Sequence, residues 1–202
     1  IACFSFNGNK LITSGGGGMI VTDHEEWARR SRYLTTQAKD DPVEYIHNEI
    51  GYNYRLTNIQ AAMGCAQVEK LDEYLAAKRR IARTYDERLS SVPGIAGMAE
   101  APWAASASWM YTMSVDDVGY GIGSRDLLRR LEDSGIQTRP LWQPLNRSKA
   151  HSGDHVYDCP VAEEIWRKAL SLPCSVGLNA TDQTRVIDLV RACSRSPEVT
   201  RN

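Results

Sequence analysis

The stretch IACFSFNGNKLITSGGGGMIV, residues 1–21, decides the fold. Residues 1–6 at its start and residues 19–22, which begin within it, are short apolar runs that predict buried strands, and a polar, glycine-rich loop separates them. Four consecutive glycines, residues 15–18, close this loop. They form either a flexible turn or a place where backbone passes close to a bulky planar group, because glycine has no Cβ. They do not match a nucleotide-binding P-loop, which ends in Gly-Lys-Ser/Thr.

One lysine, Lys10, lies inside this loop. On the loop alone it could be an ordinary solvated side chain. A lysine held between strand ends and walled by glycines can instead be desolvated, which favours the neutral amine. A neutral amine condenses with an aldehyde to form a Schiff base. Both interpretations stay open at this point.

The rest of the first half predicts two helices around an irregular stretch. Asp23 is placed to cap a helix that runs to about residue 34. Residues 35–56 are rich in aromatic and amide side chains and predict no regular element. Thr57 begins a second helix, and its apolar periodicity continues to about residue 89 as one long or kinked helix.

The second half alternates strands and helices, which indicates α/β architecture. We expect a strand at 109–115, helices at 124–134, 162–170 and 181–193, and short extended pieces at 137–139 and 170–173. A boundary near residues 89–101 would divide the chain into two domains, 1–90 and 91–202.

Composition narrows the class of protein. Twenty-four Lys and Arg residues oppose 25 Asp and Glu residues, so the net charge is −1. We therefore expect neither nucleic acid nor an anionic membrane surface as a partner. No apolar run approaches the roughly 18 residues of a membrane span. The five cysteines are scattered and odd in number, which favours reduced thiols in a cytoplasmic protein over disulfides or zinc.

A metal site near residue 155 is also disfavoured. His151, His155 and Cys159 stand at a spacing that one helix face could share. Gly153 interrupts that helix, however, and no fourth ligand is evident. We expect no metal.

Three blocks of the sequence together resemble one family. Residues 3–21 look like the Schiff-base-lysine segment of the DegT/DnrJ/EryC1/StrS sugar aminotransferases. GYNYRLTNIQAA (51–62) and GIQTRPLW (135–142) resemble its second and third blocks, and LSLPCS (170–175) also fits. The resemblance implies an α/β fold of the aspartate-aminotransferase type (fold type I). The chain would hold the C-terminal part of the large domain, with the connecting helix, and the small C-terminal domain.

The resemblance also implies pyridoxal 5'-phosphate (PLP) as cofactor and assigns roles by position. Lys10 would carry the Schiff base and act as the acid and base of the 1,3-proton shift. Ser5 would bind the cofactor phosphate. Asn53 would reach the phosphate of the neighbouring subunit's cofactor, which implies a homodimer with shared active sites. Substrate contacts are expected from Arg55, Arg139 and Trp142, although Arg55 could equally form a structural ion pair and Trp142 could be a core residue.

Three short stretches resemble one branch of the family and imply a substrate. Residues 7–10, 36–39 and 138–142 look most like the branch that aminates UDP-4-keto-6-deoxy-N-acetylglucosamine, with glutamate as the amino donor. GDP-perosamine synthases share parts of the first block and are the nearest alternative. Sugar dehydratases of the family carry His in place of the Schiff-base lysine, so Lys10 disfavours them. A truncated, catalytically inactive PLP-fold module is the non-enzymatic alternative.

Two departures from the family pattern matter. Asn146 stands where the family often carries His. The family's amino-terminal half, with the aspartate that pairs with the pyridine nitrogen, is absent from these 202 residues. We therefore expect a C-terminal fragment that is inactive alone and that exposes strand edge and apolar surface.

Overall fold

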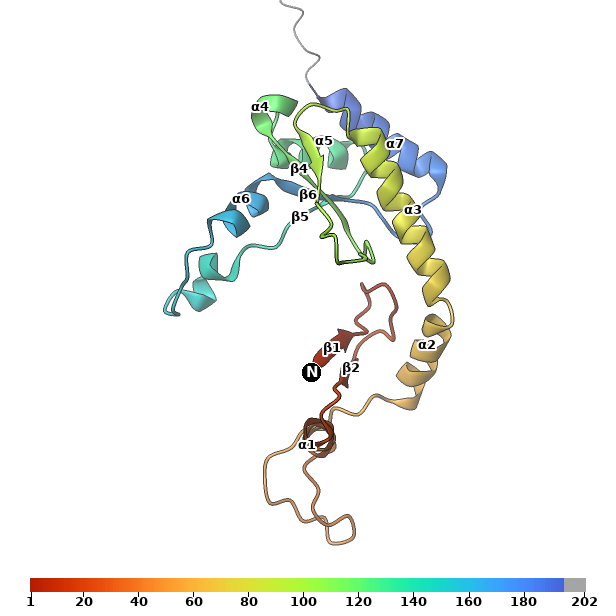
Figure 1. The fold of residues 1–202 in the computed structure, drawn as a ribbon, viewed down its shortest axis with the longest axis vertical. Coiled ribbons are helices and arrows are strands. Elements are labelled where there is room, and N and C mark those ends of the chain that lie inside the picture. The colour runs from red at the N-terminus through yellow and green to blue at the C-terminus, as the bar shows by residue number, and fades with distance from the viewer. Residues whose placement is uncertain (195–202) are drawn as a thin grey trace, which may run out of the picture. The chain divides into compact units, whose positions relative to one another are not determined.

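The computed structural model describes residues 1–194, which divide into two compact units, Ile1–Tyr74 and a second unit that begins at Leu75 (Figure 1). The first unit contains strands β1 (Ala2–Ser5) and β2 (Gly18–Val21) and helices α1 (Glu25–Thr35) and α2 (Asn58–Val68). Helix α3 (Leu71–Leu89) follows α2 after two residues. The predicted division into domains 1–90 and 91–202 stays a prediction.

The two predicted strands around the glycine-rich loop form an antiparallel hairpin. Ala2 pairs with Val21, and the register continues to Ser5 opposite Gly18. A Cβ on Gly18 would lie 2.4 Å from the Phe4 carbonyl oxygen, so the close pairing at this end of the hairpin requires glycine.

The helix starts were predicted with mixed success. Thr57 caps α2 as expected, in a capping box whose Gln60 N–H donates to the Thr57 hydroxyl at 3.3 Å. The cap predicted at Asp23 is wrong, because α1 begins after His24, whose side chain makes no capping hydrogen bond. The long helix predicted to residue 89 is interrupted between α2 and α3.

The second unit is built on a four-stranded antiparallel sheet in the order β3-β4-β6-β5. Its strands are β3 (Ile95–Gly97), β4 (Tyr111–Val115), β5 (Arg139–Pro140) and β6 (Ala169–Leu172). Its helices are α4 (Asp117–Tyr120), α5 (Ser124–Asp133), α6 (Pro160–Lys168) and α7 (Ala180–Cys193), with 3₁₀ turns at Leu145–Arg147 and Lys149–His151. The three-residue β3 and the short α4 were not predicted from the sequence.

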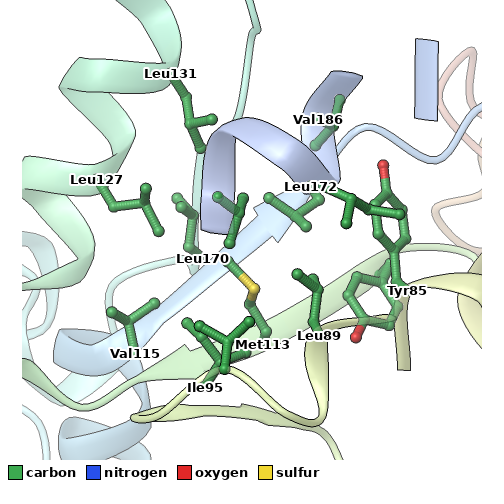
Figure 2. Packing of buried hydrophobic residues seen from close by; sticks show 14 of the residues in the cluster. Tyr85, Leu89, Ile95, Met113, Val115, Leu127, Leu131, Leu170, Leu172 and Val186 are labelled. Carbon is green, nitrogen blue, oxygen red and sulfur yellow. The ribbon is translucent and has the colours of Figure 1, made fainter. Parts of the chain in front are cut away.

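Apolar side chains of the second unit form a continuous core (Figure 2). Residues 111, 113 and 115 of β4 alternate inward, as the period of a strand requires, and Met113 is fully buried. Leu127 of α5, Leu170 of β6 and Ile187 of α7 are also fully buried. Helices α5 and α7 therefore pack their apolar side chains against this face of the sheet.

The first unit lacks such a core. Among its described residues, Ala38 is the only buried hydrophobic one. All eight residues of the hairpin strands are exposed, including Phe4 at 55% and Met19 at 53%. The expected exposure of strand edge and apolar surface is thus seen in this unit, whereas the burial predicted for the two strands is wrong in this chain, because no layer of the described residues covers them.

Over residues 1–194, no helix is both long and apolar enough to cross a bilayer.

Candidate functional site

The loop between β1 and β2 folds back on its own first residue. The carbonyl oxygen of Phe6 accepts the Ser14 N–H at 3.0 Å and the Thr13 hydroxyl at 3.0 Å. The Lys10 N–H donates to the Asn7 carbonyl at 3.0 Å and closes a turn. Lys10 is half-buried. The sequence placed Lys10 in this loop between two strands, and the structure agrees.

Backbone conformation and close contacts within the protein explain why this loop contains glycines. Gly15 and Gly17 have φ of +80° and +76°, a backbone conformation that glycine adopts without strain. A Cβ on Gly17 would lie 2.4 Å from a methyl carbon of Leu56. Ser14, almost fully buried, fixes the turn by donating its hydroxyl to the Gly16 carbonyl at 2.6 Å. The glycine run is thus a turn with defined contacts rather than a flexible one, and the close approach of a planar group stays a prediction.

A cavity of about 1100 Å³ opens beside the hairpin. Strand ends, helix α1 and the segment before α2 line it, and Ser5 and Arg55 both belong to its lining. Its other lining residues include Gly18, Thr35, Thr36 and Tyr54. Lys10 and Asn53 are outside this lining. The structure therefore brings Ser5 and Arg55 to one cavity and leaves Lys10 in the adjoining loop.

Residues 37–52, here called the arm, leave helix α1 and return beside its end. Thr36 and Asn53 form an antiparallel bridge at the base of the arm. The Tyr52 N–H donates to the Leu34 carbonyl at 2.7 Å, and the Tyr54 N–H donates to that of Thr35 at 3.0 Å. Asn53 is exposed. The irregular stretch predicted from the sequence thus holds Asn53 against the last turn of α1.

The remaining two predicted site residues lie in the second unit. Arg139 pairs with Ser171 across β5 and β6, and its side chain is exposed. Trp142 is 66% exposed, and its ring lies 6.3 Å from that of Trp109 at an angle of 18°. The sequence assigned Trp109 only to a strand. Its contact with Trp142 joins residues 33 positions apart, and no local pattern signals it.

Asn146, which stands where the family often has His, has a partner on helix α6. Its amide donates to a Glu163 carboxylate oxygen at 3.0 Å, and Arg147 lies 3.7 Å from the other oxygen. His151 pairs instead with Asp154 at 2.6 Å. Within residues 1–194, no group of three His, Cys, Asp or Glu side chains is arranged to hold a metal ion.

Comparison with known proteins decides the family. The sequence profile of the DegT/DnrJ/EryC1/StrS aminotransferase family matches residues 1–191. The chain belongs to this family. Its fold is the predicted fold type I, which these PLP-dependent sugar aminotransferases share.

Individual relatives agree with this assignment. EpsN of Bacillus subtilis strain 168, whose name describes a pyridoxal phosphate-dependent aminotransferase, is 36% identical over 200 residues, 97% of this chain and 51% of EpsN. GDP-perosamine synthase of Caulobacter vibrioides is 36% identical over 190 residues, 92% of this chain and 50% of the synthase. The crystal structure of the aminotransferase TlmJ of Streptoalloteichus hindustanus superposes with a TM-score of 0.86 at 29% identity, covering 95% of this chain and 51% of TlmJ. The chain spans about half the length of the curated relatives it matches.

Aminotransferases of this family depend on PLP, and the residues present fit that cofactor by their chemistry. The Lys10 amine is a group that condenses with an aldehyde. The Ser5 hydroxyl oxygen accepts the Asn7 N–H at 3.4 Å, which leaves the hydroxyl proton to donate to a phosphate oxygen. The exposed amide of Asn53 is a second donor of the kind that phosphate accepts.

Proposed function

We propose that the whole protein moves an amino group from glutamate to the 4-keto carbon of a nucleotide-linked 6-deoxy sugar, UDP-2-acetamido-2,6-dideoxy-4-hexulose. The observation that carries this is the position of Lys10, in the turn between β1 and β2 of a chain that belongs to a family of sugar aminotransferases. PLP, when bound, supplies an electron sink that makes the proton on the amine-bearing carbon labile.

Lys10 is the proposed catalytic residue. Its amine holds the aldehyde of the cofactor and, once released, stays beside the carbon whose proton moves. It can therefore serve as both base and acid of the 1,3-proton shift, taking the proton from the amine-bearing carbon and returning it at the other end of the shift. The Ser5 hydroxyl donates to the cofactor phosphate, and the Asn53 amide donates to the phosphate of the cofactor in a second subunit of a homodimer.

Arg55 is the proposed anion-binding residue. It lines the same cavity as Ser5, and its planar guanidinium suits a substrate phosphate or the carboxylate of the amino donor. Arg139 and Trp142 are proposed to contact the sugar nucleotide. The exposed face of Trp142 offers a surface on which a nucleobase can stack.

A second candidate differs only in the sugar nucleotide. The identity to a GDP-perosamine synthase over 92% of this chain favours a GDP-linked 4-keto-6-deoxy sugar. The same amine would serve both reactions, so the two candidates separate at Arg139 and Trp142 rather than at Lys10.

The test is amino transfer by the whole protein with PLP and glutamate. We expect amination of the UDP-linked 4-keto sugar, detected by the mass of the product, and a loss of at least 10³-fold in Lys10→Ala, because no other group takes both of its roles. Lys70→Ala is the matched control, since Lys70 is exposed and pairs with Glu73. Amination of the GDP-linked sugar alone would select the second candidate. A wild-type protein that aminates neither sugar and retains no cofactor absorbance after free PLP is removed would favour the inactive module.

A further inference from the structure

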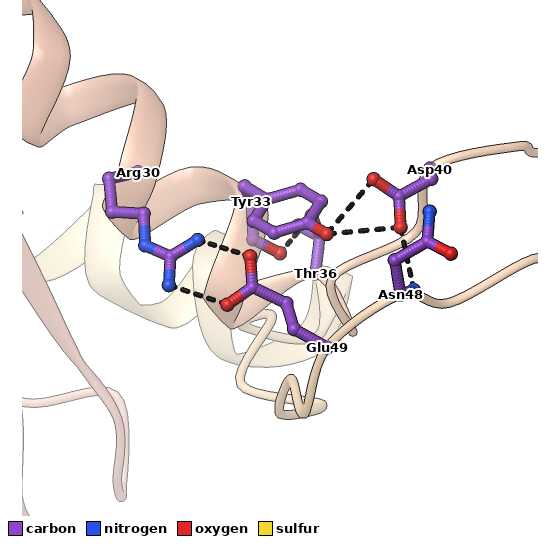
Figure 3. A network of polar contacts seen from close by, with 6 residues as sticks. All are labelled: Arg30, Tyr33, Thr36, Asp40, Asn48 and Glu49. Carbon is purple, nitrogen blue, oxygen red and sulfur yellow. Dashed lines mark hydrogen bonds and ion pairs between the residues drawn. The ribbon is translucent and has the colours of Figure 1, made fainter.

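Two residues of helix α1, Arg30 and Tyr33, hold polar groups of the arm (Figure 3). The Arg30 guanidinium donates to both carboxylate oxygens of Glu49, one of them at 2.6 Å. The Tyr33 hydroxyl lies 3.0 and 3.1 Å from the two oxygens of Asp40 and donates to that carboxylate. Asp40 also accepts the Asn48 N–H at 2.8 Å. Because Arg30 lies over the Tyr33 ring, 5.6 Å from its centre, these contacts form one network.

The backbone of the arm is strained where it leaves the helix. Gln37 and Ala38 have φ of +75° and +47°, a region that residues other than glycine rarely adopt. Ala38 is fully buried, and a Cβ on Gly51 would lie 2.3 Å from its backbone nitrogen. The His47 Nδ1–H donates to the Gln37 carbonyl oxygen at 2.7 Å. Contacts from the returning side of the arm thus surround Gln37 and Ala38, whose positive φ the local sequence does not favour.

Apolar packing gives the arm little support. Its large apolar side chains are exposed, with Val43 at 78% and Ile50 at 82%. Ala38 is its only buried residue in the described part of the chain. The strained backbone is therefore held by the polar network together with the backbone hydrogen bonds at the base of the arm.

We propose that Arg30 and Tyr33 are positioning residues that preorganise Asn53 for the phosphate of the cofactor. This inference rests on the proposed function, because it takes Asn53 as a phosphate ligand. Asp40 lies on the outgoing side of the arm and Glu49 on the returning side, four residues before Asn53. Tying both carboxylates to one helix face fixes the two sides relative to α1, so Asn53 is held in place before the ligand arrives.

The size of the effect follows from the nature of the contacts. Exposed ion pairs are worth little individually, but a bidentate arginine within a network is the geometry in which they contribute most. Removing both the Arg30–Glu49 pair and the Tyr33–Asp40 hydrogen bond is expected to weaken the affinity about tenfold.

The experiment is a double-mutant cycle on PLP affinity in the whole protein, measured by absorbance titration. We expect Arg30→Ala/Tyr33→Phe to weaken PLP binding about tenfold, and to have no further effect in an Asn53→Ala background. Arg29→Ala is the matched control, because Arg29 is on the same helix and makes only an exposed 3.9 Å pair with Glu26. Hydrogen exchange should quicken at Asn48 and Tyr52 and stay unchanged in β4 and β6, which a general loss of stability would not produce.

Two other results would be informative in different ways. If wild type binds PLP and the double variant retains its full affinity, or if the loss is additive with Asn53→Ala, the positioning role is wrong while the proposed function stands. If wild type binds no PLP, the proposed function itself fails, and exchange at Asn48 and Tyr52 then reports only on the arm.

Discussion

Lys78 is the clearest case in which a single polar side chain organises the second unit. It is 6% exposed, on helix α3, and its amine donates to the carbonyl oxygens of Trp109 and Cys174, the latter at 2.6 Å. These two carbonyls flank strands β4 and β6, so one ammonium group joins a helix to both. The run Lys78, Arg79 and Arg80 predicted a solvated helix face, and the burial of Lys78 shows this prediction to be wrong for that residue. Its partners are 31 and 96 residues away.

Lys78→Met should therefore destabilise the whole protein by about 2–3 kcal/mol, because it leaves two partly buried carbonyl oxygens without their donor. Urea unfolding followed by circular dichroism measures this change. Arg80→Met, at an exposed position of the same helix, should change stability by less than about 0.5 kcal/mol. Equal effects of the two substitutions would show that the contacts of Lys78 contribute nothing.

At the scale of elements, local signals were sufficient where a hydrogen bond closes within a few residues. The helix start at Thr57 and the helix predicted at 124–134, which Gly135 follows with φ of +75°, were both found as predicted, whereas the capping box at Thr57 was not predicted. The start of α1 was not, because the backbone at His24 is extended and Asp23 lies outside the cap position. The arm was predicted only as irregular, since its shape depends on left-handed φ at Gln37 and on pairs up to 19 residues apart.

The arm should loosen in acid. The Arg30 guanidinium lowers the pKa of Glu49, and the Asn48 N–H, followed by the Tyr33 hydroxyl, lowers that of Asp40. When folding lowers the pKa of a carboxyl group, that group stabilises the folded form at pH values above its pKa in the unfolded chain, about 4. This contribution is lost as the pH falls through the lowered pKa of the folded form. The NMR shift of the Asn48 amide should therefore be constant from pH 7 to about 5 and change below 4. A midpoint well above pH 5 would contradict this cause.

At the scale of the whole molecule, the two units differ in how they are stabilised. The second unit has a continuous apolar core, whereas Ala38 is the only buried hydrophobic residue described in the first. Apolar burial is the main favourable term in folding, so the first unit cannot be stable on its own contacts. The residues proposed for cofactor binding, Lys10, Ser5 and Asn53, all lie in this unit.

Hydrogen exchange on the 202-residue chain tests this difference. Amides of β4 and β6 should be protected to nearly the global stability of the second unit, whereas those of β1 and β2 should exchange at least 10²-fold faster. In the whole protein the hairpin amides should become protected. Equal protection of the two sheets in the 202-residue chain would mean that the first unit folds independently.

The sequence could predict the candidate site only in part, for reasons of scale. Lys10 and its loop follow from residues within 20 positions of one another, and family resemblance supplied their chemistry. The cavity shared by Ser5 and Arg55 and the contact of Trp142 with Trp109 join segments 50 and 33 residues apart. Contacts between segments so far apart in the sequence depend on tertiary packing, which the hydrophobic periodicity of a segment does not predict.

The attachment point of the cofactor can be read from the mass of one peptide. The whole protein is incubated with PLP, reduced with borohydride, digested and analysed by mass spectrometry. We predict a single pyridoxyl adduct on Lys10 and none in Lys10→Ala. An adduct on a different lysine, or no adduct on a protein that is otherwise folded, would contradict the assignment of Lys10 as the residue that holds the cofactor.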